Sequence, residues 1–196
     1  DETAGLGASD SSGNMNNATA NGTTIVTGKL NNARSFNGSS DNMSAPGFTI
    51  GPNYSFSMWL KPAGYVDTVS ANNSEWFQQS GGVLQDVQFN SGSGDFLVGM
   101  YIGGFYYSYT MKPPTISIGQ WSFVAVTLNG TTLTFYVNNV SNSLTTAGTP
   151  NASAGTIYIG DFGNAGYHFN GSIDDVRIYN RALSAAEIKA IYDATK

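Results

Sequence analysis

The sequence predicts an all-β protein in which two antiparallel sheets pack face to face, with one short helix at the C-terminus. Short runs of β-branched and aromatic residues alternate with polar residues and are separated by Gly, Asn, Ser and Pro. This pattern is typical of strands joined by turns. Many strands without intervening helices favour antiparallel sheets over a parallel sheet with crossover helices.

The individual strands are predicted from alternation and from turn residues. Residues 54–61 place Phe56, Met58 and Leu60 on one face. Asn129-Gly130 is the strongest hairpin signal in the chain, and Gly103-Gly104 is a second plausible turn. Strands are expected at residues 54–61, 95–102, 105–111, 120–128, 132–137, 156–160 and 172–179.

The predicted helix follows a capping box. Ser184 stands three residues before Glu187, so the hydroxyl and the carboxylate satisfy exposed amides of the first turn. The apolar residues Ile188, Ile191 and Tyr192 then follow at helical spacing. We expect this helix to pack against the sandwich.

The 196 residues suit a single domain, because all-β sandwiches commonly reach this length without splitting. Residues 1–24 are polar and Gly-rich, which indicates either a long loop or disorder. No repeat or Pro-rich linker divides the chain, so one domain is predicted over residues 1–196.

Composition excludes several classes of partner. The net charge is -5 and charged residues make up only 11% of the chain, so nucleic acid is not expected as a partner. No run of 18 apolar residues occurs, and this segment is not expected to insert into a membrane. The chain has no cysteine, which excludes a disulfide framework and a thiolate metal site.

The segment F-N-G-S-I-D-D-V-R-I-Y-N-R-A-L-S-A-A-E-I, residues 169–188, resembles the closing strand and helix of laminin G-like domains of secreted microbial proteins. These are concanavalin A-like jelly rolls of the lectin/glucanase superfamily. Further similar segments occur in family order at residues 1–5, 10–14, 33–38, 56–62, 119–127 and 133–138. The resemblance implies an antiparallel two-sheet jelly-roll sandwich in an extracellular or cell-surface protein, with flanking domains in the same polypeptide.

The chain departs from the family in two places. The first strand of the family normally precedes the Asp-Glu pair that here stands at residues 1–2, so this strand is missing or lies upstream. Asn138-Asn139 replaces the usual Asn-Gly. Because Asn tolerates a positive φ, we still expect a tight turn there.

The resemblance also implies a structural calcium ion between the loop at residues 10–14 and the closing strand. Ca²⁺ takes six to eight oxygen ligands from carboxylates, amides, main-chain carbonyls and water. Alternation would put Asp174 on one face with Val176 and Ile178, where an unpaired charge would be costly. Alternatively, Asp10 caps a turn and Asp174 pairs with Arg177, Arg181 or main-chain amides. The candidate metal ligands are Asp10, Asn14, Asn16 and Asp174.

Aromatic residues suggest a carbohydrate site, because rings stack on the apolar faces of sugars. Trp76 and Phe77 are expected in a polar insertion, and a cluster of rings follows in the hairpin at residues 101–109. The alternative is that at least half of these rings are core, since Phe105, Tyr107 and Tyr109 share one face. The candidate ligand-binding residues are Trp76, Tyr101 and Tyr106.

Catalysis has little support. Glycoside hydrolysis needs two close carboxylates, whereas Glu2, Glu75 and Glu187 are placed in a terminus, a loop and a helix. Asp174-Asp175 are adjacent on a strand and point oppositely. The single histidine, His168, is expected in the loop before the closing strand. No catalytic residue is predicted.

The sequence therefore predicts a non-catalytic carbohydrate-binding or adhesion module of a larger extracellular protein, stabilised by a structural calcium ion. Its expected partner is a glycan or polysaccharide. The alternative is a protein-interaction or structural domain of a surface adhesin or appendage, which would bind a surface protein and have no sugar site.

Overall fold

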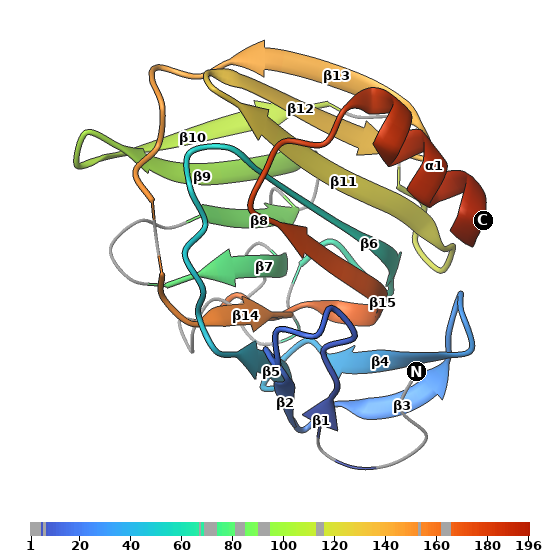
Figure 1. Ribbon diagram of the computed structural model, residues 1–196. Helices are drawn as coiled ribbons and strands as arrows, with labels where there is room; N and C mark the ends of the chain where they lie inside the picture. Colours follow the sequence, from blue (N-terminus) through green and yellow to red (C-terminus); the bar gives the residue numbers. More distant parts are fainter. Residues whose placement is uncertain are drawn as a thin grey trace.

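The computed structural model describes residues 5, 7–66, 68, 74–80, 85–89, 95–112, 116–152, 154–161 and 166–196. Two antiparallel sheets pack face to face, as predicted (Figure 1). In spatial order, the eight-stranded sheet comprises β1 (Gly7–Ala8), β2 (Ala18–Asn21), β5 (Asn42–Ala45), β14 (Ile157–Ile159), β7 (Ser74–Gln79), β8 (Gln85–Phe89), β9 (Phe96–Ile102) and β10 (Phe105–Met111). The seven-stranded sheet comprises β13 (Val140–Thr145), β12 (Thr132–Val137), β11 (Ser122–Asn129), β6 (Tyr54–Pro62), β15 (Asn170–Tyr179), β4 (Asn32–Asn37) and β3 (Thr24–Thr27).

The main core lies between the two sheets. Phe56, Met58 and Leu60 all face it from β6, which confirms the predicted alternation. From the opposite sheet, Phe77 stacks on Phe56 with ring centroids 4.7 Å apart. Because rings from the two sheets pack against each other in this way, the inner faces fix the orientation of one sheet relative to the other.

A second apolar cluster lies on the outer face of the seven-stranded sheet, under helix α1 (Ala185–Thr195). Trp59 alternates with the core residues of β6 and packs there against Phe123 and Tyr192. The capping box is present as predicted: the Glu187 N–H donates to the Ser184 hydroxyl, and the Ser184 N–H donates to the Glu187 carboxylate. The helix thus covers part of one outer face (Figure 1).

The predicted turns are also confirmed. The β9–β10 hairpin turns at Gly103 and Gly104, which both have positive φ. The β11–β12 hairpin turns directly after Asn129, with Gly130 at φ 60. Asn138 and Asn139 have φ 47 and 69 and join β12 to β13, so the Asn-Asn pair forms the expected tight turn.

Three predictions of local structure were wrong. The N-terminal region is not only a loop, because it contains β1 and β2 at the edge of the eight-stranded sheet. Trp76 and Phe77 do not lie in an insertion but in β7, between β14 and β8. A bulge in β7 after Glu75 disturbs its alternation, so the sequence does not read as a regular strand.

The third wrong prediction concerns β15. Asp174 does not share a face with Val176 and Ile178, because β15 contains a bulge between Asp174 and Arg177, with Asp175 at φ 48. The extra residue shifts the alternation. Asp174 pairs in register with Trp59 of the outer cluster, whereas Val176 and Ile178 pack against the main core.

Candidate functional site

The candidate site lies on the outer face of β8, β9 and β10, at the far end of the eight-stranded sheet from β1. Asp86 of β8 lies opposite Gly99 of β9, and Tyr106 reaches across from β10. The Tyr106 hydroxyl donates a hydrogen bond to Asp86 Oδ2 at 3.2 Å. A β-carbon at Gly99 would overlap both partners, so the missing side chain makes this cross-strand contact possible.

A second tyrosine extends the site. Tyr101 and Tyr106 are cross-strand partners in the hairpin, and their rings meet edge to face at 5.4 Å and 63°. The Tyr106 side chain is 44% exposed, although its hydroxyl is anchored to a buried acid. Such a fixed and accessible ring offers a surface on which an apolar ligand face can stack.

The anchoring carboxylate is itself buried. Asp86 is only 2% exposed. Burial raises its pKa to about 6, although hydrogen bonds from its own main chain, from Tyr106 and from Gly99 favour the charged form. Burial, together with the Asp86 carboxylate, raises the pKa of the Tyr106 hydroxyl, which is protonated and able to donate at neutral pH.

A second buried acid adjoins Asp86. Glu75 of β7 pairs in register with Gln88, and its side chain is completely buried. Burial raises the pKa of Glu75 well above its ordinary value, and the nearby carboxylates of Asp86 and Asp161 contribute to this rise. The sequence placed Glu75 in a loop, so its contribution to a buried cluster was missed.

The cluster continues past the end of β14. Asp161 is completely buried, with His168 Nδ1 3.3 Å from Asp161 Oδ1. The Asn42 side-chain amide donates to Asp161 Oδ2 at 3.5 Å. His168 lies just before β15, as predicted, but it contacts this buried acid instead of only decorating the surface.

The three predicted ligand-binding residues do not lie together. The structure brings Tyr101 and Tyr106 side by side but places Trp76 in the core. The Trp76 side chain is 0% exposed and packs edge-on against Phe89 and Phe96, with ring centroids 4.6 Å away in each case. A ring without exposed surface has no face available to a sugar. The predicted alternation placed Phe105 on the core face with Tyr107 and Tyr109. In the structure Phe105 is 71% exposed near the hairpin turn.

The four predicted metal ligands line one cleft between the two sheets, which we call the inter-sheet cleft. Within it, main-chain amides already bind both carboxylates. Asp10 accepts bonds from the Ser12 and Asn16 N–H groups at 2.8 and 2.9 Å. Hydrogen bonding from the Ser12 side chain and from these two amides lowers the pKa of Asp10. Asp174 accepts bonds from Leu30 N–H at 2.8 Å and Asp175 N–H at 2.7 Å.

These bonds match the alternative interpretation, in which Asp10 caps a turn and Asp174 binds main-chain amides. Of the remaining ligands, Asn14 donates from its amide to the Ser12 hydroxyl, and Asn16 contributes its main-chain N–H. Each oxygen of the two carboxylates thus accepts a main-chain hydrogen bond. In the part of the chain that the structure describes, no group of three His, Asp or Glu side chains is placed to hold a metal ion. Calcium binding stays a prediction.

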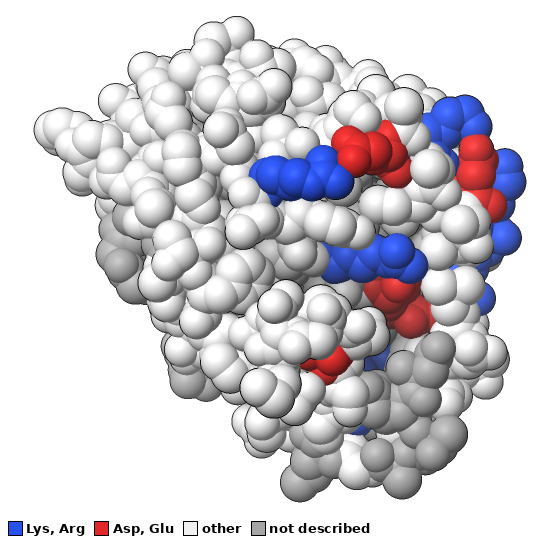
Figure 2. All heavy atoms as spheres, viewed as in Figure 1, with Lys and Arg blue, Asp and Glu red and all other residues white. Residues whose placement is uncertain are grey.

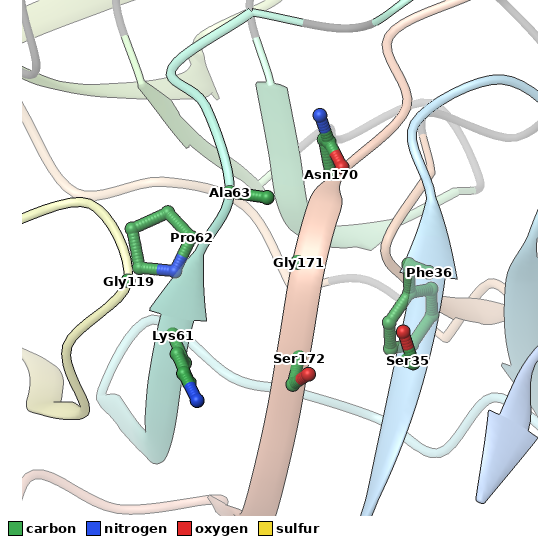
Figure 3. Close-up of a pocket in the computed structure, with 9 residues that line it drawn as sticks. All are labelled: Ser35, Phe36, Lys61, Pro62, Ala63, Gly119, Asn170, Gly171 and Ser172. Atoms are coloured by element: carbon green, nitrogen blue, oxygen red, sulfur yellow. The ribbon is translucent and has the colours of Figure 1, made fainter. Parts of the chain in front are cut away.

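A smaller hollow lies where β4, β6 and β15 meet (Figure 3). Its volume is about 200 Å³, and Ser35, Lys61 and Asn170 are among its lining residues. Ligand pockets for small molecules usually exceed about 300 Å³. This hollow is therefore too small to hold an oligosaccharide.

The face shown in Figure 2 has an uneven distribution of charge. Lys, Arg, Asp and Glu gather around α1 and the end of β15, whereas the β9–β10 hairpin at the left is uncharged. The exposed large apolar side chains of this hairpin are the rings of Phe105 and Tyr106. Such a surface suits a neutral ligand better than a polyanion.

The fold is a jelly-roll β-sandwich. It has two antiparallel sheets, aromatic side chains packed between them and a closing helix with a capping box. The chain belongs to the concanavalin A-like lectin/glucanases superfamily, whose laminin G-type profile matches residues 37–189. No curated protein matches the chain. Among the described residues, no helix is long and apolar enough to cross a membrane.

Solved structures share this fold at low sequence identity. The binding domain of Paraclostridial Mosquitocidal Protein 1 aligns with a TM-score of 0.77 and 16% identity over 95% of this chain and 49% of that chain. Domain 4 of AbnA, a GH43 extracellular arabinanase from Geobacillus stearothermophilus solved with arabinotriose, aligns with a TM-score of 0.75 and 21% identity over 96% of this chain and 92% of that chain. The botulinum neurotoxin serotype G binding domain aligns with a TM-score of 0.71 and 16% identity over 94% of this chain and 48% of that chain. The chain thus spans about half the length of the two toxin domains.

Proposed function

We propose that this domain is a non-catalytic carbohydrate-binding module of a larger extracellular protein, and that it binds a neutral glycan on the outer face of β8–β10. The observation that carries the proposal is the anchored tyrosine pair. Tyr101 and Tyr106 offer rings for stacking, and a hydrogen bond from the Tyr106 hydroxyl to the buried Asp86 fixes one of these rings. Sugar-binding sites usually combine aromatic rings with a few fixed polar groups.

The comparisons support the class of ligand. One structure with the same fold is an extracellular enzyme's domain in complex with arabinotriose, and others are named as toxin binding domains. This chain also covers 92% of Domain 4 of AbnA, so the two have similar lengths. We therefore propose a plant-type or bacterial polysaccharide as the ligand and an extracellular location for the protein.

The buried acids support a role other than catalysis. A retaining or inverting hydrolase needs two carboxyl groups that contact the substrate from either side. Glu75 has no exposed surface, and Asp86 is held by Tyr106. We propose that these acids shape and polarise the base of the binding surface and transfer no proton to a substrate.

Isothermal titration with arabinan, xylan and glucan oligosaccharides tests this function. Tyr106→Ala should abolish binding of whichever oligosaccharide the wild-type domain binds. Tyr107→Phe is the matched control, because Tyr107 lies on the same strand and pairs with the buried Met100 of the core face. Equal affinity of wild type and Tyr106→Ala would contradict the site. No binding on a broad glycan array would favour the alternative protein-interaction domain.

Calcium at Asp10, Asn14, Asn16 and Asp174 remains part of the proposal. When bound, the ion would link the N-terminal loop to β15 through oxygen ligands of the kind it prefers. Thermal unfolding with calcium and with a chelator is the direct test. A melting temperature that rises with calcium in wild type, and stays constant in Asp174→Asn, would support the site. Identical melting curves for wild type with and without calcium would exclude it.

A further inference from the structure

Four polar side chains form a buried cluster on the outer face of β7 and β8. In register, Glu75 lies opposite Gln88 and Gln78 lies opposite Asp86. Val87 lies in the main core, so its neighbours Asp86 and Gln88 face outwards. The two residues after Glu75 both lie in the core because of the bulge, so Gln78 returns to the outer face. We call these four residues the polar square.

The side chains of the polar square are buried without sufficient donors. Both carboxylate oxygens of Glu75 and the Oε1 atoms of Gln78 and Gln88 are shielded from solvent, and among the described residues none donates a hydrogen bond to them. Burying an acceptor without a donor is costly, and it is more so for a carboxylate. All four atoms are oxygens, so the cluster is suited to a positively charged ligand.

No basic side chain supplies this charge. In the part of the chain that the structure describes, the ion pairs of lysine and arginine go to Asp175 on β15 and to Glu187 and Asp193 on α1. Burial raises the pKa of Glu75, and the Val87 N–H only partly counteracts this rise without forming a hydrogen bond of normal geometry. The protein itself therefore leaves the carboxylate of Glu75 uncompensated.

Asp86 orients one of the two amides toward Glu75. The Gln88 Nε2 atom donates to Asp86 Oδ2 at 3.4 Å. Because the nitrogen and the oxygen of an amide point in different directions, Gln88 Oε1 is turned away from Asp86. Cross-strand neighbours such as Glu75 and Gln88 have β-carbons about 4.5–5.5 Å apart, so their oxygens can contact the same ion.

The number and the kind of these oxygens select the ligand. A proton on Glu75 would supply one hydrogen bond and leave an amide oxygen unsatisfied. A water molecule could donate to two oxygens but would leave the carboxylate charge uncompensated. A cation contacts all four oxygens and offsets the charges of Glu75 and Asp86, to which nearby Asp161 adds. Ca²⁺ accepts carboxylate and amide oxygens in flexible geometry, whereas Mg²⁺ demands a near-ideal octahedron.

We propose that the polar square binds one Ca²⁺ ion, with Glu75, Gln78 and Gln88 as ligands and water completing the coordination. Asp86 is a positioning residue, because it orients Gln88 and adds a second negative charge. Only one ligand is an acid, so the site differs from the groups of three His, Asp or Glu side chains that are absent among the described residues. The proposal does not rest on sugar binding, since the ion can be detected without a glycan.

Counting the calcium bound to the full chain tests the proposal. Bound calcium is measured by elemental analysis after dialysis, and its affinity by isothermal titration with calcium chloride. Glu75→Gln keeps the shape of the side chain but removes its charge, and should bind one ion fewer than wild type. Asp86→Asn should weaken the affinity about 10–100-fold, as is usual for residues that orient metal ligands. Asp193→Asn, an exposed carboxyl on α1, is the matched control and should match wild type.

Asp174→Asn separates this site from the calcium predicted at Asp174, which lies in the other sheet. The ion of the polar square should remain bound in this variant, and loss of every ion would overturn the proposal. Equal numbers of bound ions in wild type and Glu75→Gln would also overturn it. So would a wild-type chain that binds no calcium, a result that depends on no variant. Far-UV circular dichroism confirms that each variant is folded.

Discussion

Replacing Asp86 by Asn should stabilise the domain at neutral pH and remove much of its pH dependence. Asp86 is 2% exposed, and its pKa rises from an ordinary value of 3.8 to about 6 because the charged form loses hydration. The native state therefore binds more protons than the unfolded state between these two values. Stability must fall as the pH rises through this window.

The rise from 3.8 to about 6 corresponds to a loss of about 3 kcal/mol once the pH is well above 6. Asn cannot ionise, but its side-chain oxygen still accepts the Tyr106 hydroxyl bond. The stability difference between Asp86→Asn and wild type should hence grow by about 2 kcal/mol between about pH 4 and pH 7. Removing the Asp86 charge also lessens the rise in the Glu75 pKa, which flattens the profile further.

Urea unfolding followed by tryptophan fluorescence at a series of pH values measures this difference. Asp193→Asn provides the control, because Lys189 and Lys196 lower the pKa of this exposed carboxyl. Its stabilising effect is present above the unfolded pKa and is lost as the pH falls, so its trend has the opposite sign. Parallel pH profiles of wild type and Asp86→Asn would refute the reasoning.

Three further substitutions test the fold and the site. Gly99→Ala should destabilise the domain by about 1–3 kcal/mol, because its β-carbon would separate Asp86 from Tyr106, and it should weaken oligosaccharide binding measured by titration. Unchanged affinity would show that the anchor is dispensable. Trp76→Ala should cost about 3–5 kcal/mol in urea unfolding because a fully buried ring is lost, whereas a neutral effect would contradict its core position. Ser184→Ala should cost about 1 kcal/mol without altering ligand affinity, since it removes only the helix cap, and a change in affinity would argue against this separation.

Local sequence features predicted much of the fold correctly. Asn129-Gly130 and Gly103-Gly104 predicted their hairpins because positive φ is required there and few residues adopt it. Ser184 and Glu187 predicted the start of the helix, since a capping box satisfies its own amides. In each case the interaction lies within a few residues of the chain.

Predictions that depended on regular alternation were less successful. A bulge after Glu75 hid β7, and a bulge at Asp175 reversed the expected face of Asp174. A single inserted residue exchanges the two faces of a strand, and its presence depends on the partner strand. The buried acid Glu75 was missed for the same reason.

The sequence by itself determined the strand and turn pattern, the closing helix and the family to which the chain belongs. Only the tertiary structure decided that Trp76 is core while Tyr106 is accessible, that Asp86 is buried beneath a tyrosine, and that β15 contains a bulge after Asp174. Whether a ring or a carboxylate meets water depends on remote segments that pack over it, and no short-range pattern encodes those contacts.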